Sequence, residues 1–149
     1  MSKLVDNFGR QINYVRLAIT DRCNLRCQYC MPAKGIDIVP RKELLSYKEM
    51  YRLIRVLTEL GVNKVRLTGG EPFARRDFIN FLEMLSFNDL LDAVNITTNG
   101  ALISNHIETI ERLKKVKNIN LSLDSLQADK FHEITRRDVF DDVYTAFEL

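Results

Sequence analysis

The stretch YVRLAITDRCNLRCQYC, residues 14–30, joins a strand-like run, Tyr14–Thr20, directly to three cysteines, Cys23, Cys27 and Cys30. These are all the cysteines of the chain. Their odd number argues against a disulfide framework, and their close spacing favours one local metal site. Three thiolates suit a soft metal or an iron–sulfur cluster. A zinc site with a borrowed fourth ligand and three unrelated thiols are the alternatives.

The segment that carries the cysteines, Asp21–Leu45, separates the first strand from the next expected helix by about 25 residues. Structureless loops of this length are uncommon and are usually functional. The chain has no fourth cysteine, and we interpret His106 and His132 as surface residues of helices. One iron of a four-iron cluster would then lack a protein ligand and would be open to a substrate or cofactor.

Three further strand-like runs, Lys64–Thr68, Ala93–Thr98 and Asn120–Asp124, recur at the spacing of strand-plus-helix units. The expected helices lie between them and after them. Ser46 and Glu49 form a capping box for the helix that Gly61 ends, and Asp77 and Ser104 are expected to cap the next two. Two more helical stretches follow. The first covers about 128–135, and the second begins near Val139. This order predicts an α/β fold with a parallel sheet.

Each expected strand alternates apolar and polar residues, which is unusual for parallel strands because these are normally buried on both faces. Arg16, Arg66, Thr97 and Ser122 fall on the polar faces. A polar face indicates either the lumen of a barrel with a binding site at the carboxyl ends of its strands, or a two-layer sheet with one wet face. An arginine in such a place needs a structural carboxylate or a polyphosphate as its partner.

The second strand ends in Thr68-Gly69-Gly70-Glu71-Pro72. Two glycines let the backbone approach another group closely or adopt positive φ. The carbonyls of this turn and the Glu71 carboxylate are candidates to receive an ammonium group, and a plain turn is the alternative.

Composition excludes several classes of protein. Of the 149 residues, 46% are apolar and 28% charged, and the net charge is +2, so neither disorder nor a nucleic-acid or membrane-surface partner is expected. No run of 18 apolar residues predicts a transmembrane helix, and the first ten residues lack a signal core. We expect a cytoplasmic protein.

Taken together, the motifs resemble radical S-adenosylmethionine (SAM) enzymes. The resemblance rests on Cys23-x-x-x-Cys27-x-Tyr29-Cys30 after one strand and Gly69-Gly70-Glu71-Pro72 after the next. Within that superfamily the chain resembles the GTP 3′,8-cyclase family of molybdenum cofactor biosynthesis. The matching segments are Thr20-Asp21-Arg22-Cys23-Asn24, Arg75-Arg76-Asp77, Thr97-Thr98-Asn99-Gly100 and Ser122-Leu123-Asp124-Ser125.

The resemblance implies a barrel of the radical SAM type with a [4Fe–4S] cluster on Cys23, Cys27 and Cys30. It implies S-adenosyl-L-methionine contacts from Tyr29, Gly70 and Ser122, and GTP contacts from Arg16, Arg66 and Thr97. Reductive cleavage of S-adenosyl-L-methionine would give a 5′-deoxyadenosyl radical that converts GTP to 3′,8-cyclo-7,8-dihydro-GTP. An electron donor and a homodimer are the further partners expected.

The family pattern is longer than this chain. We expect residues 1–149 to be the N-terminal part of a radical SAM core domain, a partial TIM-like (β/α) barrel that ends after about four βα units. The later barrel strands and a second cluster region are absent, so full activity is not expected from this chain alone. The fourth strand should have an open edge, which is an association hazard. Rival functions are a radical SAM enzyme for a peptide or other small molecule and a non-catalytic, metal-stabilised binding module.

Overall fold

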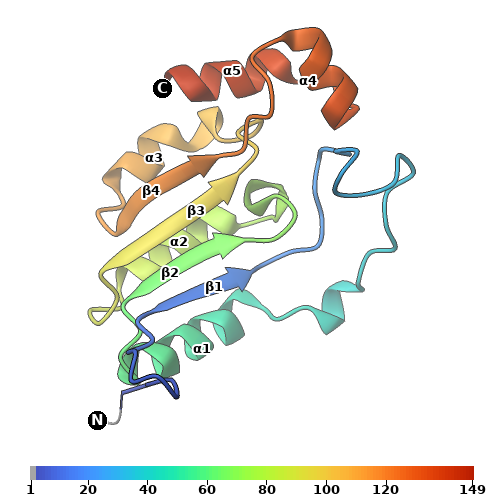
Figure 1. Cartoon of the computed structure of the whole chain (residues 1–149). Coiled ribbons are helices and arrows are strands. Elements are labelled where there is room, and N and C mark those ends of the chain that lie inside the picture. Colours follow the sequence, from blue (N-terminus) through green and yellow to red (C-terminus); the bar gives the residue numbers. More distant parts are fainter. Residues whose placement is uncertain (1–2) are drawn as a thin grey trace.

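Four parallel strands form the centre of the computed structural model, which describes residues 3–149. Their order in the sheet is β1-β2-β3-β4 (Figure 1). Arg16 pairs with Arg66, and Arg66 with Asn95, so that strand positions align across the sheet. The α/β class and the parallel sheet predicted from the sequence are confirmed. The strands are β1 (Tyr14–Ala18), β2 (Lys64–Thr68), β3 (Ala93–Thr98) and β4 (Val116–Leu121).

The helices alternate with the strands up to β4, and two helices then follow at the carboxyl end of the sheet (Figure 1). Three short 3₁₀ turns interrupt the connections. The α-helices are α1 (Tyr47–Glu59), α2 (Phe78–Ser86), α3 (Ile107–Arg112), α4 (Ala128–Thr135) and α5 (Phe140–Glu148). The 3₁₀ turns are η1 (Arg41–Glu43), η2 (Pro72–Ala74) and η3 (Ser104–His106).

The helix starts show which local signals were sufficient. Ser46 and Glu49 form the expected capping box at α1, and Gly61 follows that helix with φ of 99°. Asp77 is the N-cap residue of α2, as expected, but it is left-handed (φ 63°) and its side chain makes no capping hydrogen bond. The prediction for Ser104 is wrong. Ser104 begins the turn η3, and α3 starts one turn later, with His106 at its N-cap.

The predicted boundaries of the fourth strand, Asn120–Asp124, are wrong by about four residues at the start. In the structure β4 begins at Val116, which pairs with Val94 of β3, and it ends at Leu121 opposite Thr98. A bulge between Val94 and Asn95 shifts the register of this pair of strands. The shift breaks the strict alternation of side chains, which is the signal used to place a strand from sequence.

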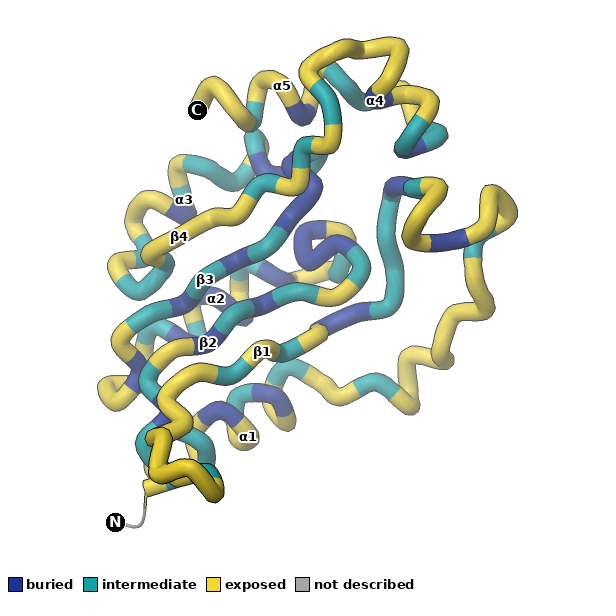
Figure 2. Tube along the Cα trace, viewed as in Figure 1, coloured by how far each residue is buried: buried dark blue, intermediate teal, exposed yellow. Residues whose placement is uncertain are grey.

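One face of the sheet carries the core. Val65, Leu67, Val94 and Ile96 point to that face and are almost fully buried. Helices α1 and α2 lie behind it (Figure 1), and the buried residues follow β2 and β3 (Figure 2). The helices contribute the other buried apolar side chains, among them Met50, Ile54, Phe78, Phe81, Leu82, Leu85 and Ile110.

The opposite face of the sheet is polar, as the alternation predicts. Arg16 is exposed, Arg66, Asn95 and Thr97 are half-buried, and Asn120 is exposed. β4 forms one edge of the sheet, and most of its residues are exposed (Figure 2). Between residues 3 and 149, no helix combines the length and the apolar character that crossing a membrane requires.

Candidate functional site

The cysteine loop leaves β1 at the carboxyl edge of the sheet and returns to α1 without a regular helix or strand until η1 (Figure 1). The loop is nevertheless ordered by specific contacts. The Asp21 carboxylate accepts a hydrogen bond from the Val39 backbone N–H at 2.7 Å, which joins the two ends of the excursion. The long functional loop expected over 21–45 is present, with the short turn η1 inside it.

Gly69 and Gly70 fix the start of this loop. The Gly70 N–H donates to the Thr20 carbonyl at 2.7 Å, and the Glu71 N–H donates to the Arg22 carbonyl at 2.7 Å. A β-carbon on Gly69 would collide with the Thr20 carbonyl, and one on Gly70 with the Arg22 carbonyl. The glycine pair therefore allows a close approach of two backbones, and it places the residue before Cys23 against the end of β2.

Glu71 does not offer an exposed carboxylate. Its side chain is completely buried. One oxygen accepts hydrogen bonds from the Phe73 N–H (3.0 Å) and the Thr98 hydroxyl (2.7 Å), and the other accepts the Asn99 N–H (2.8 Å). Burial raises the pKa of the carboxyl group, although these hydrogen bonds oppose the shift. Our interpretation of this carboxylate as an ammonium receptor is wrong, because its oxygens instead connect the ends of β2 and β3.

Asn99 extends this network to the first cysteine. Its side-chain amide lies 2.8 Å from the Asn24 side-chain oxygen and 3.7 Å from the Cys23 Sγ. The Leu25 N–H also donates to the Cys23 Sγ, at 3.4 Å. Such N–H···S contacts stabilise a thiolate and, in iron–sulfur proteins, adjust the reduction potential. In the sequence, Asn99 stands out only within the matching segment Thr97-Thr98-Asn99-Gly100, with no role of its own.

The three thiols occupy one side of the loop entrance. Cys23 and Cys27 are half-buried, and Cys30 is exposed. Burial is the main cause that raises the pKa of Cys23 and of Cys27, and the charge of Cys30 adds to both shifts. Burial thus favours the protonated form of the Cys23 and Cys27 thiols, and binding of a metal to them would release protons. A cavity of about 240 Å³ opens beside Cys23, and it is lined by Asp21, Arg22, Cys23, Arg26, Met31, Ile36 and Ile38.

Three cysteine thiols in one loop are the soft donors that an iron–sulfur cluster requires. Among residues 3–149, no three His, Cys, Asp or Glu side chains converge closely enough to hold one metal ion. A four-iron cluster does not need such convergence, because each thiolate ligates a different iron. Arg22 and Arg26 beside the cavity would offset the negative charge of a cluster.

The predicted S-adenosyl-L-methionine contacts lie around the same entrance. Tyr29 is 71% exposed, and its hydroxyl donates to the Asp124 carboxylate at 2.8 Å. Burial raises the pKa of Tyr29, and the hydrogen bond to Asp124 adds to the shift. Ser122 follows β4 directly, and its N–H donates to the Thr98 carbonyl at 2.8 Å. Asp124, which the sequence did not single out, thus joins the cysteine loop to the end of β4.

The predicted GTP contacts lie on the polar face of the sheet. Arg16 and Arg66 are register partners on β1 and β2, and Thr97 lies two residues beyond Asn95, the partner of Arg66 on β3. Within residues 3–149 neither arginine forms an ion pair. The Arg66 Nε is buried with no hydrogen-bond partner in the described chain. No carboxylate of residues 3–149 pairs with either arginine.

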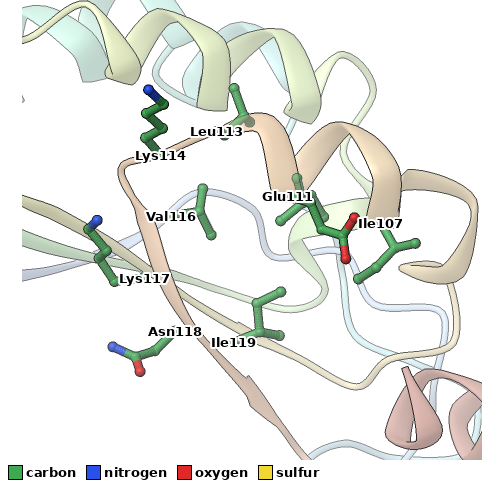
Figure 3. A pocket seen from close by; sticks show the side chains of 9 residues that line it. Ile107, Glu111, Leu113, Lys114, Val116, Lys117, Asn118 and Ile119 are labelled. Atoms are coloured by element: carbon green, nitrogen blue, oxygen red, sulfur yellow. The ribbon is translucent and has the colours of Figure 1, made fainter.

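A cavity of about 560 Å³ lies away from these residues, between α3 and the exposed edge of β4 (Figure 3). Ile107, Leu113, Val116 and Ile119 make it mainly apolar, and Lys114 and Lys117 stand at its rim. It contains no cysteine and none of the residues predicted to bind a cofactor or substrate. The largely apolar lining marks it as part of the uncovered sheet edge and not as part of the cysteine site.

A parallel α/β sheet with a three-cysteine loop after its first strand and a glycine turn after its second defines a class of protein. The sequence profile of the radical SAM superfamily matches residues 17–149, and the chain belongs to that superfamily.

Comparison with individual relatives indicates which members of the superfamily this chain resembles. The chain is 43% identical over 147 residues to the GTP 3′,8-cyclase of Desulforamulus reducens. This alignment covers 97% of this chain and 44% of the relative. The chain is also 43% identical over 148 residues to molybdenum cofactor biosynthesis protein 1 of Drosophila melanogaster. That alignment covers 99% of this chain and 26% of the relative. The chain thus spans less than half the length of these curated relatives.

Among solved structures, the chain resembles Streptococcus suis SuiB bound to its precursor peptide SuiA. The TM-score is 0.69 and the identity 28%, over 91% of this chain and 29% of that one. The partial radical SAM fold expected from the sequence is confirmed. The roles of the individual site residues stay predictions.

Proposed function

We propose that this chain carries the cluster- and S-adenosyl-L-methionine-binding part of a GTP 3′,8-cyclase, an enzyme that converts GTP to 3′,8-cyclo-7,8-dihydro-GTP. The main support is the juxtaposition of the cysteine loop with a face that presents Arg16 and Arg66 without a carboxylate partner. The names and the identity of the curated relatives point to the same reaction.

In this proposal Cys23, Cys27 and Cys30 hold a [4Fe–4S] cluster. When bound there, the cluster supplies the electron that cleaves S-adenosyl-L-methionine and generates a 5′-deoxyadenosyl radical, after reduction by an external donor. Tyr29, Gly70 and Ser122 would position S-adenosyl-L-methionine at the same entrance. The Tyr29 hydroxyl donates a hydrogen bond to Asp124, which connects the Cys27–Cys30 turn to the segment after β4.

On the polar face, Arg16 and Arg66 would bind the triphosphate of GTP. Guanidinium groups match phosphate oxygens in bidentate geometry, and a partly buried site strengthens the interaction because water competes less. Thr97, further along the same face, would contact GTP closer to the carboxyl ends of the strands and therefore closer to the cysteine loop. This arrangement would orient the ribose toward the site of the radical.

The first test is anaerobic reconstitution with iron and sulfide. We expect about four irons per chain in the unsubstituted protein and loss of the cluster in Cys27→Ala. Reductive cleavage of S-adenosyl-L-methionine to 5′-deoxyadenosine, measured by chromatography, should accompany the cluster. A full cluster in Cys27→Ala, or zinc instead of iron in protein purified without oxygen, would contradict the assignment.

The second test addresses the substrate. Arg66→Ala should weaken GTP binding at least about tenfold, because a charged hydrogen-bond donor to phosphate is lost. Arg55→Ala, on the outer surface of α1, is the matched control and should bind GTP normally. The likeness to SuiB, solved with a precursor peptide, makes a peptide substrate the rival. Unchanged GTP affinity in Arg66→Ala would favour that rival.

A further inference from the structure

The C-terminal end of α4 is attached to the cysteine loop by hydrogen bonds that span more than 100 residues of sequence. The Arg26 N–H donates to the Thr135 carbonyl, and the Gln28 N–H to the Ile134 carbonyl, each at 2.9 Å. The Gln28 side chain donates to the Glu133 carbonyl at 2.7 Å. Figure 1 shows α4 and the loop at the same end of the sheet.

Arg136 makes the most informative of these contacts. One nitrogen of its guanidinium donates to the Arg26 carbonyl at 3.0 Å and to the Met31 carbonyl at 3.2 Å. These two carbonyls bracket the turn that carries Cys27 and Cys30. Within that turn, the Cys30 and Met31 N–H groups both donate to the Cys27 carbonyl, at 2.9 and 3.1 Å. Arg136 therefore closes the turn from outside while backbone hydrogen bonds close it from inside.

The backbone of Arg136 supports a specific role for its side chain. Arg136 is left-handed, with φ of 56°, at the C-cap of α4. This conformation is strained for a non-glycine residue, and glycine is the usual residue there. An arginine tolerates the cost when its side chain makes contacts that glycine cannot make. Such strained residues cluster at functional sites because the surrounding structure holds them.

We propose that Arg136 is a positioning residue that holds the Cys27–Cys30 turn in the conformation in which its thiols can ligate the cluster. That the turn is held for a cluster rests on the proposed function, whereas the contact between Arg136 and the turn is present in the protein without a cluster. Its positive charge lies against a loop that would carry three thiolates, and it helps to offset their charge. Arg137 contributes a weaker contact of the same kind, to the Asn24 carbonyl at 3.3 Å.

The test is backbone hydrogen exchange in the 149-residue chain without metal. Arg136→Gly removes the guanidinium and relieves the backbone strain, so the melting temperature should stay equal or rise. Exchange at the Cys30 and Met31 amides should nevertheless accelerate about tenfold, because a charged hydrogen-bond donor no longer holds the turn. Arg136→Met, which keeps the strain and the aliphatic stem, should show the same acceleration.

The matched control is Asp77→Gly, which relieves the other left-handed non-glycine residue of the described chain, at the start of α2 and outside the cysteine loop. It should leave exchange at Cys30 and Met31 unchanged. Unchanged exchange in both Arg136 variants would overturn the proposal.

A second measurement, on the iron-loaded protein, distinguishes failure of this inference from failure of the proposed function. After reconstitution, iron loss to a chelator should be about tenfold faster in Arg136→Gly than in the unsubstituted protein or Asp77→Gly. Equal rates of iron loss in these proteins would refute a role of Arg136 in holding the cluster. A chain that binds no iron at all would refute the proposed function, and the exchange measurement would still decide whether Arg136 holds the turn.

Discussion

Glu71 illustrates how burial changes the role of a residue. In the sequence it is an acidic side chain after two glycines, which suggests a ligand group. In the structure it accepts hydrogen bonds from Phe73, Thr98 and Asn99 and has no exposed surface. A buried acceptor with several donors is costly to remove, because each donor is left without a partner. Glu71 therefore fixes Asn99, and through it the surroundings of Cys23.

We predict that Glu71→Ala lowers the free energy of unfolding by about 1 to 3 kcal/mol, because the donors are left unsatisfied. The effect should depend on pH. Since burial raises the pKa of Glu71 in the folded state, the protonated form is favoured by folding. The contribution of Glu71 to stability is then fully present below its unfolded pKa and declines as pH rises through the folded value. Denaturant unfolding at several pH values measures both effects.

Glu71→Gln is the control for the pH dependence, since its amide does not titrate. The stability difference between Glu71→Gln and Glu71→Ala should be the same at every pH. If the difference between the unsubstituted protein and Glu71→Ala instead grows as pH rises, the direction assigned to the pKa of Glu71 is wrong.

Among the secondary-structure elements, those whose signals are local were predicted best. The capping box of α1 uses two residues three positions apart, so it is legible in the sequence and present in the structure. The start of β4 depends on the bulge opposite Val94, a pairing between residues more than 20 positions apart. A single-strand alternation pattern carries no information about that pairing.

The glycine turn between β2 and η2 is the element that couples the sheet to the cysteine loop. We predict that Gly70→Ala lowers the free energy of unfolding by about 1 to 3 kcal/mol, because a β-carbon there overlaps the Arg22 carbonyl. The same overlap should displace the loop, so that reconstituted protein holds less iron. Thermal unfolding and iron analysis measure the two effects.

Gly9→Ala serves as the comparison for this element. Gly9 has positive φ but no atom near the position of an added β-carbon, so its substitution costs strain alone. We expect a modest loss of stability and normal iron content. Equal iron content in Gly70→Ala and Gly9→Ala would contradict the idea that close backbone approach positions the loop.

As a whole, the molecule has one covered and one open face of its sheet, and β1 and β4 are the two edge strands. The edge of β4 carries exposed Ile119, and the apolar cavity along α3 continues from it (Figure 3). An unpaired edge strand offers its backbone N–H and C=O groups to another strand. The sequence predicted this open edge, and the sheet order confirms it.

We predict that the 149-residue chain associates with itself through the β4 edge as its concentration rises. Ile119→Lys should reduce the association, because a charge on an edge strand opposes pairing. Analytical ultracentrifugation over a range of concentrations measures the effect. Val56→Lys, at an exposed apolar position of α1, is the matched control. A chain that is monomeric throughout, or an equal effect of both substitutions, would refute this prediction.

The parallel α/β class, the three-cysteine loop and the polar face of the sheet can be predicted from the order of the amino acids. These features follow from spacing and alternation along the chain, which act over a few residues. The buried connecting role of Glu71, the contact of Asn99 with Cys23 and the contact of Arg136 with the Cys27–Cys30 turn are visible only in the folded protein. Those contacts join segments 27 to 110 residues apart. They arise because parallel strands deliver their carboxyl ends, and the loops that follow, to one edge of the sheet.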